Sequence, residues 1–120
     1  MDARLRDGIR LFNDGRFFES HETWERFYQE TEDADKPFLE GLIELAVAFR
    51  LYADFGEIKG PVRMIYQALI RFENYQTSHL EIRVKELSES METWAKEADT
   101  SGKPLSSIPK IRLQGFSIFT

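Results

Sequence analysis

Apolar residues recur along most of the chain at spacings of three and four, which is the period of an amphipathic α-helix. This pattern predicts five helices, at about residues 2–14, 16–31, 37–55, 60–75 and 79–98. The third of these segments is apolar on nearly every side, so we expect it to be the central helix of a bundle. Charged residues interrupt it at several positions, and a membrane-spanning helix is therefore not expected there.

Glycines mark the corners between the predicted helices. Gly15 and Gly56 each follow a periodic segment and suit the left-handed position that ends a helix. The first four helices should therefore form two antiparallel hairpins. Gly41 lies inside the central helix, where glycine costs about 1 kcal/mol relative to alanine, and this predicts close approach of a neighbouring helix or of a side chain such as Tyr28. Ser78, followed by Glu81, fits a capping box at the start of the fifth helix.

The last part of the chain, residues 99–120, has a different character. Gly102, Pro104 and Pro109 prevent a long helix there. The segment is nevertheless too apolar for a free tail, because it contains Ile108, Ile111, Leu113, Phe116, Ile118 and Phe119. We expect an extended strap that lies over a groove of this chain or of a partner subunit. The predicted fold is all-α: one domain, residues 1–120, with a five-helix bundle at 1–98 and an extended segment at 99–120.

Composition excludes several classes of protein. The formal net charge of -5, without a basic stripe, argues against a nucleic-acid partner. The chain has no cysteine, which excludes disulfides and thiol chemistry. The N-terminus has no uninterrupted apolar run of the kind found in a secretory signal. We therefore expect a soluble cytoplasmic protein that binds neither nucleic acid nor membrane. No phosphate-binding loop or dinucleotide fingerprint is present.

The candidate chemistry lies between the second and third helices. A short turn joins them, so they should be antiparallel, with Tyr28 level with Glu40. In this register His21, Glu25 and Glu44 converge on the same region as Tyr28 and Glu40. A carboxylate on such an apolar helix must be paired, protonated or bound to a cation.

Three hypotheses explain this cluster. In the first, His21, Glu25, Glu40 and Glu44 bind a metal ion, with Mg²⁺ or Mn²⁺ favoured over Zn²⁺ by the oxygen-rich ligand set. In the second, the cluster is a ligand or catalytic pocket in which His21 and a glutamate exchange protons. In the third, His21 hydrogen-bonds a glutamate and the network sets the register of two helices. The structural hypothesis leads, because a lone histidine on an apolar helix face is usually a satisfied core residue.

Two stretches of the sequence carry a family resemblance. They are Phe12-Asn13-x-Gly15-x-Phe17-Phe18-Glu19-x-His21-Glu22-x-x-Glu25 and Phe38-Leu39-Glu40-Gly41-Leu42-Ile43-Glu44-Leu45-Ala46-Val47-Ala48. Together they resemble the domain of unknown function 309 family over about residues 11–68. The resemblance implies an all-α bundle in a cytosolic protein and implies no reaction.

The resemblance also indicates which positions matter. The polar positions of the family pattern fall on Asn13, Glu19, His21, Glu22 and Glu25. The family usually has glutamine at positions 40 and 44, where this chain has glutamate, so these positions need hydrogen-bonding capacity. That favours a polar network or an organic ligand over a metal site of four ligands.

These observations predict a non-catalytic domain that binds a ligand or a protein. The alternative is a hydrolase that depends on Mg²⁺, Mn²⁺ or Zn²⁺ and uses the same His/Glu cluster; no other cofactor is expected. A homodimer, a protein partner and a small molecule all stay open as partners. The candidate site residues are Asn13, Glu19, His21, Glu22, Glu25, Tyr28, Glu40 and Glu44.

Overall fold

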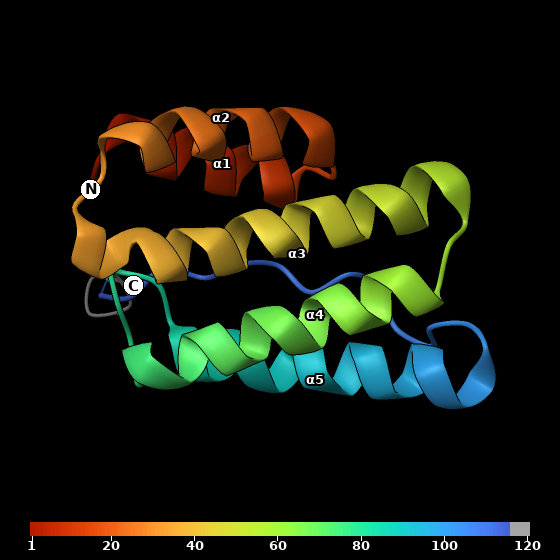
Figure 1. The fold of residues 1–120 in the computed structure, drawn as a ribbon. Coiled ribbons are helices and arrows are strands. Elements are labelled where there is room, and N and C mark those ends of the chain that lie inside the picture. Colours follow the sequence, from red (N-terminus) through yellow and green to blue (C-terminus); the bar gives the residue numbers. More distant parts are fainter. Residues whose placement is uncertain (116–120) are drawn as a thin grey trace.

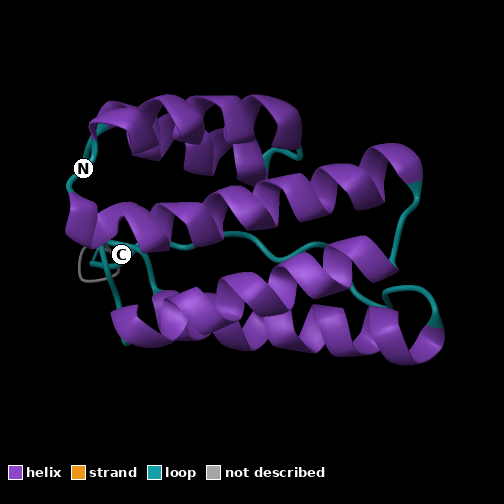
Figure 2. Ribbon diagram, in the orientation of Figure 1, coloured by secondary structure: helices purple, strands orange, loops and turns teal. Residues whose placement is uncertain are grey.

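The computed structural model describes residues 1–115, and its regular structure is helical (Figure 1, Figure 2). The five α-helices are α1 (Ala3–Asn13), α2 (Phe17–Glu30), α3 (Lys36–Phe55), α4 (Lys59–Phe72) and α5 (Val84–Ser101). Two short 3-10 helices, η1 (Asp33–Asp35) and η2 (Glu73–Tyr75), precede α3 and follow α4. Within the described residues the only β-type pairings are isolated bridges. The all-α, five-helix prediction is confirmed. None of these helices is long and apolar enough to cross a membrane.

The central helix, α3, lies between two helix pairs (Figure 1). On one side it contacts α2, which packs on α1, and on the other side it contacts α4, which packs on α5. Gly15 and Gly56 have φ angles of 80° and 68°, the left-handed values predicted for the two hairpin corners. The N–H of Gly56 donates to the carbonyl of Tyr52 at 2.9 Å, which closes the last turn of α3.

Aromatic rings connect these layers through the core. The ring of Phe12 on α1 lies 5.1 Å from that of Phe17 and 5.8 Å from that of Phe49 on α3. Phe49 in turn meets Trp94 on α5 edge to face, with 4.9 Å between ring centroids. Full burial of such a side chain contributes about 1.5–3 kcal/mol, so these contacts hold α3 against both neighbouring layers.

One face of α3 remains partly open, which differs from the expectation of a helix enclosed on every side. Its buried face carries Phe38, Leu39, Gly41, Leu42, Leu45, Ala46, Ala48 and Phe49. The opposite face includes Ile43, Glu44 and Val47, which are only half-buried. Glu40 and Glu44 therefore lie at the edge of the core, where water reaches them.

Two glycines allow close packing between helices. A Cβ on Gly41 would lie 2.6 Å from Cε1 of Phe72 on α4, so the close approach predicted at this glycine is confirmed, although the partner is Phe72 instead of Tyr28. A Cβ on Gly8 would lie 2.1 Å from the indole nitrogen of Trp24. These contacts bring α3 close to α4, and α1 close to α2.

The fifth helix begins later in the chain than the sequence predicted. The capping box of Ser78 and Glu81 does not form, because α5 begins at Val84. His79 and Ile82 instead exchange backbone hydrogen bonds of 3.1 and 2.8 Å and enclose a tight turn. Both central residues of this turn have positive φ angles, 47° for Leu80 and 65° for Glu81, so the backbone there cannot continue a helix.

The segment after α5 runs back along the bundle as an extended strap (dark blue in Figure 1). Ile111 is only 3% exposed, and its neighbours Ile108 and Leu113 pack against the core. The N–H of Gln114 donates to the carbonyl of Glu81 at 2.7 Å, which ties the strap to the turn before α5. The groove that receives the described part of the strap thus belongs to this chain. Phe116, Ile118 and Phe119 lie outside the described residues.

Candidate functional site

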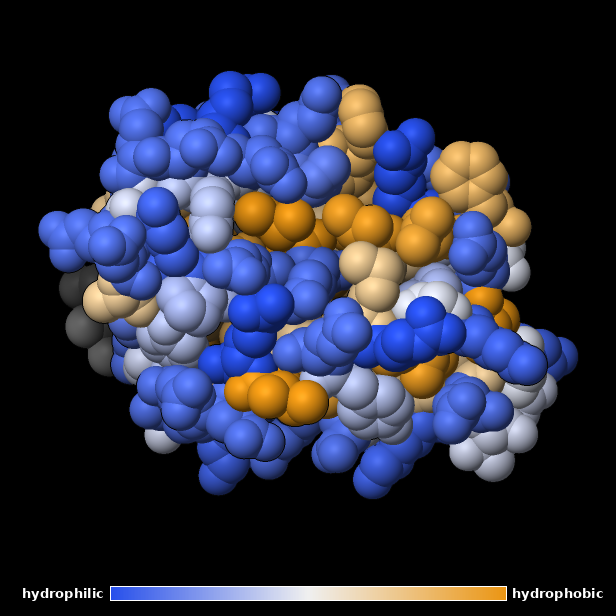
Figure 3. Space-filling view, viewed as in Figure 1, coloured by the Kyte–Doolittle hydropathy of each residue, from blue (hydrophilic) through white to orange (hydrophobic). Residues whose placement is uncertain are grey.

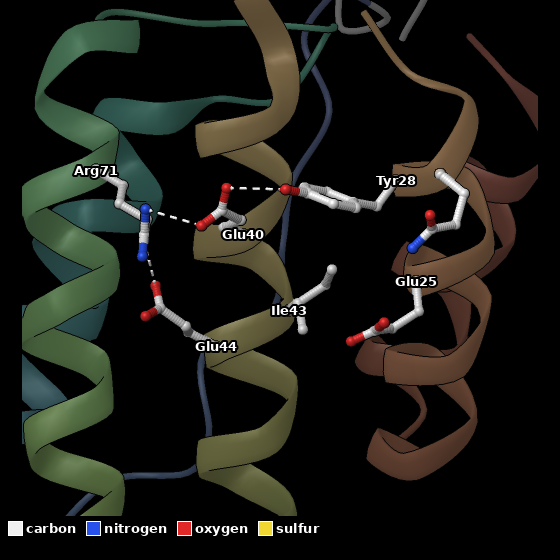
Figure 4. Close-up of a pocket in the computed structure, with 7 residues that line it drawn as sticks. Glu25, Tyr28, Glu40, Ile43, Glu44 and Arg71 are labelled. Carbon is white, nitrogen blue, oxygen red and sulfur yellow. Dashed lines mark hydrogen bonds and ion pairs between the residues drawn. The ribbon is translucent and has the colours of Figure 1, made fainter. Parts of the chain in front are cut away.

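The register predicted between α2 and α3 is present in the structure. The hydroxyl of Tyr28 on α2 donates a hydrogen bond to Oε1 of Glu40 on α3, at 3.1 Å (Figure 4). The short connection through η1 makes the two helices antiparallel and brings these residues to the same level. Tyr28 and Glu40 therefore begin a polar site on the open face of α3.

Arg71 on α4 extends this site across α3. Its Nε donates to Oε1 of Glu44 at 2.8 Å, and its Nη1 lies 3.1 Å from Oε2 of Glu40 (Figure 4). The Glu40 side chain is 37% exposed and that of Glu44 is 17% exposed. One guanidinium therefore pairs with both carboxylates, which was one of the three states expected for acids on this helix. The connected groups span α2, α3 and α4.

An open pocket of about 220 Å³ lies beside this network, and we call it the Arg71 pocket. Its lining residues come from α2, α3 and α4 and are Glu25, Tyr28, Gln29, Glu40, Ile43, Glu44 and Arg71. Ile43 lies between Glu44 on one side and Glu25 on the other (Figure 4). The pocket thus combines an apolar residue at its centre with carboxylates at its edges.

Hydrogen bonding to Glu40 changes the acidity of Tyr28. The phenol donates its proton to a carboxylate, and loss of that proton would place two negative charges in contact. This hydrogen bond raises the pKa of Tyr28 above its ordinary value of 10.0, and desolvation acts in the same direction. Tyr28 is accordingly a neutral hydrogen-bond donor across the physiological range.

His21 takes a peripheral place. Its Nε2 lies 3.1 Å from Oε1 of Glu25, one turn along the same helix, and its ring meets Phe18 edge to face. His21 is not among the residues that line the Arg71 pocket, whereas Glu25 is. Glu22 is exposed and forms no ion pair with another residue of the described part of the chain. The structure therefore brings Glu25, Tyr28, Glu40 and Glu44 together, without His21 or Glu22.

Asn13 and Glu19 make contacts that stabilise the fold. The side-chain amide of Asn13 donates to the carbonyl of Ile111 at 2.9 Å and accepts from its N–H at 2.8 Å. Glu19 pairs with Arg16 across the first turn of α2, and this hydrogen bonding lowers the pKa of the Glu19 carboxyl. Neither residue lines the Arg71 pocket.

The four residues considered as metal ligands do not form a shared site. Among residues 1–115, no group of three or more His, Asp and Glu side chains is placed to hold an ion. The physical reason is Arg71, because its guanidinium lies against both Glu40 and Glu44 and already supplies a positive charge there. His21 and Glu25 form a separate pair on α2. The four side chains are therefore divided between an Arg71 network and a His21–Glu25 pair, and do not surround a common point.

Sequence reasoning missed Arg71, which connects the site. It placed the fourth helix at about residues 60–75 and considered none of the polar side chains of that helix for the site. The same antiparallel register that aligned Tyr28 with Glu40, applied to the hairpin of α3 and α4, places Arg71 level with Glu44. A second signal for Arg71 was that two half-buried carboxylates need a positively charged partner.

The chain matches one family model, described as Domain of unknown function (DUF309), over residues 5–64. This match covers half of the 120 residues, so the chain belongs to this family, as the two motifs indicated. The matched region contains every predicted site residue but ends before Arg71. None of the curated proteins matches the chain.

Proposed function

We propose that this member of the DUF309 family is a non-catalytic binding domain, and that the Arg71 pocket binds a positively charged organic group. The observation that carries the proposal is the lining of the pocket, which contains the three carboxylates of Glu25, Glu40 and Glu44 and a single guanidinium, that of Arg71. Acidic groups outnumber basic ones by two, so a cation is favoured over an anion.

Two carboxylate oxygens of the pocket have no hydrogen-bond donor among the described residues, and they suit an ammonium group. Oε1 of Glu44 accepts from Arg71, and Oε1 of Glu25 faces His21. The second oxygen of each carboxylate accepts no hydrogen bond from the rest of residues 1–115. An ammonium carries three N–H donors and no acceptor. These two oxygens, on either side of Ile43, can each accept a hydrogen bond from such a group.

The size of the pocket limits the ligand. A volume of about 220 Å³ is below the range of about 300–1,000 Å³ that is usual for drug-sized ligands. Ile43 offers an apolar surface for a short alkyl chain. The proposal is therefore a small alkylamine, or the lysine side chain of a protein partner.

The arrangement favours binding over catalysis. Two of the three carboxylates are held by ion pairs with Arg71, which fixes their positions. The one histidine near the site points to Glu25 on its own helix and does not line the pocket. Nucleophilic catalysis needs a nucleophile within hydrogen-bonding reach of a base, and the described lining contains no serine, threonine or cysteine.

A nuclear magnetic resonance titration tests the proposal. Butylamine is added to isotope-labelled full-length protein, with butanol and butyrate as neutral and anionic controls of the same chain length. We expect saturable shifts at the amides of Glu25, Gln29, Ile43 and Glu44 with butylamine, with a Kd of about 1 mM or below, which corresponds to about 4 kcal/mol of binding free energy. Equal shifts with butanol, or no shifts at these amides, would refute the proposal.

A further inference from the structure

A second open depression adjoins the Arg71 pocket, and we call it the Ile70 pocket. Its volume is about 330 Å³, and its lining residues are Glu44 on α3 and Gln67, Ile70 and Arg71 on α4. Glu44 and Arg71 line both depressions, so their ion pair forms the wall between them (Figure 4). A ligand that crosses this wall contacts both depressions.

The two depressions differ in charge. The lining of the Arg71 pocket has two more carboxylates than guanidinium groups, whereas the lining of the Ile70 pocket has one of each, joined at 2.8 Å. The apolar side chain of Ile70 is 64% exposed there, and contact with another apolar group would remove it from water. Figure 3 shows a hydrophobic area over α4, separated by hydrophilic residues from the hydrophobic strip between α2 and α3. The Ile70 pocket therefore suits an apolar group, beside the cation of the Arg71 pocket.

The wall between the depressions offers hydrogen bonds to a peptide backbone. Arg71 uses Nε for Glu44 and Nη1 for Glu40, and its Nη2 forms no hydrogen bond within residues 1–115. The Arg71 side chain is 36% exposed, so a ligand reaches the guanidinium from solvent and can accept from it with a carbonyl oxygen. Gln67 is exposed beside it, and its amide has the donors and the acceptor that match the carbonyl and the N–H of a peptide unit.

An extended peptide also has the required arrangement of side chains. Alternate residues of an extended chain point to the same side and lie about 6.5–7 Å apart. A lysine and an apolar residue two positions away can therefore enter the two depressions while the backbone between them crosses the wall. A long alkylamine would instead lay methylene groups over the Arg71–Glu44 pair, which removes water from these charges without replacing its hydrogen bonds.

We propose that the Arg71 and Ile70 pockets together bind an extended segment of a protein partner. A lysine of the segment enters the Arg71 pocket, and an apolar residue two positions away enters the Ile70 pocket. This inference rests on the proposed function, because the lysine ammonium takes the place of the alkylamine. It adds the kind of partner and the contribution of Gln67 and Ile70, which do not line the Arg71 pocket.

Isothermal titration of capped peptides into the full chain tests the proposal. The probe is Leu-Ala-Lys-Ala-Leu, which carries an apolar residue on both sides of the lysine and so fits either chain direction. We expect its Kd to be lower by about fivefold or more than that of Ser-Ala-Lys-Ala-Ser, because a leucine side chain leaves water. Methionine in place of the lysine should raise the Kd by about tenfold or more, because the charge-assisted hydrogen bonds are lost.

The outcomes separate this inference from the proposed function. Equal Kd values for the leucine and serine peptides, or for the lysine and methionine peptides, would overturn the two-pocket partner while butylamine binding still supports the Arg71 pocket. A chain that binds neither butylamine nor the peptides would overturn both.

A pair of matched variants tests where the apolar residue binds. Ile70 and Phe55 are both exposed apolar side chains, at 64% and 62%, and only Ile70 lines the Ile70 pocket. Ile70→Ser should reduce the preference for the leucine peptide over the serine peptide to about twofold or less, because the apolar contact is lost. Phe55→Ser should keep the wild-type preference, and both variants should keep the wild-type circular dichroism spectrum. Loss of the preference in both variants, or in neither, would overturn the placement.

Discussion

Asn13 and Ile111, which are 98 residues apart, are joined by two hydrogen bonds. The side-chain amide of Asn13 offers one donor and one acceptor, and both meet the backbone of Ile111 as a neighbouring β-strand would. The last residue of α1 thereby fixes the strap at the point where Ile111 enters the core. An asparagine in the family motif thus has a structural role in this chain.

Loss of the two Asn13–Ile111 hydrogen bonds, which we call the clamp, should lower the stability of the fold. Asn13→Ala leaves the N–H and the carbonyl of Ile111 without partners in a half-buried place, and each unsatisfied group costs about 1–3 kcal/mol. We expect urea denaturation to show a loss of about 2–4 kcal/mol in the free energy of unfolding. Asn74→Ala, at an exposed position of η2, should change stability by less than about 0.5 kcal/mol. Equal losses in the two variants would contradict the clamp.

Gly41 and Gly60 should respond in opposite directions to alanine. In a helix, alanine is favoured over glycine by about 1 kcal/mol. At Gly41 the new methyl group would lie 2.6 Å from the ring of Phe72, which is fully buried and cannot move aside. Overpacking of this kind costs about 1–3 kcal/mol, so Gly41→Ala should lower the melting temperature. At Gly60 the nearest atom would be 3.5 Å away, on a flexible glutamate, and Gly60→Ala should be neutral or stabilising. The prediction fails if both substitutions raise the melting temperature.

The two carboxylates that share Arg71 should couple to it unequally. Glu44 is less exposed than Glu40 and makes the shorter contact, so water screens its pair less. Double-mutant cycles with Arg71→Met should give a coupling energy of about 1 kcal/mol with Glu44→Gln and about 0.5 kcal/mol or less with Glu40→Gln. The reverse order would show that burial does not control the strength of these pairs.

The phenol of Tyr28 should lose its proton at a higher pH than an ordinary tyrosine does. Its folded-state pKa is raised, chiefly by the hydrogen bond to Glu40. The folded state therefore holds this proton more tightly than the unfolded state does. The resulting stabilisation is complete below pH 10 and is lost as the pH rises through the higher folded-state pKa. The ultraviolet difference titration of wild type against Tyr28→Phe should show one phenol with a midpoint above 10.0.

Glu40→Gln is the matched variant for this titration. A glutamine carries no charge, so the midpoint of Tyr28 should move down towards its ordinary value. A wild-type midpoint at or below that value would contradict the assigned hydrogen bond.

The helices and their pairing were predictable because they depend on local patterns. Apolar spacing located all five helices, and Gly15 and Gly56 occupy the left-handed corners that the pattern assigned to them. The antiparallel register of two helices joined by a short turn then placed Tyr28 beside Glu40. Glycines at the helix ends and a short turn between the helices allow few other backbone arrangements at these positions.

The rest depended on contacts that a local pattern does not encode. The turn at Leu80 and Glu81 adopts positive φ without glycine, so its sequence resembles a helix start. Asn13 binds the backbone N–H and carbonyl of Ile111. Nearly every residue carries these two groups, so the sequence does not identify Ile111 as the partner. Arg71 was missed because its role comes from a third helix that faces the two acids.

The proposed function requires that the Arg71 pocket bind a cationic group through its carboxylates. Isothermal titration of butylamine into Glu25→Gln and Glu22→Gln tests it most directly, because both glutamates lie on α2 and only Glu25 lines the pocket. Each variant removes the same charge from the chain, so long-range electrostatic effects are closely matched. We predict that the Kd rises at least fivefold in Glu25→Gln and stays within twofold of wild type in Glu22→Gln. Equal Kd values in the two variants would contradict the claim.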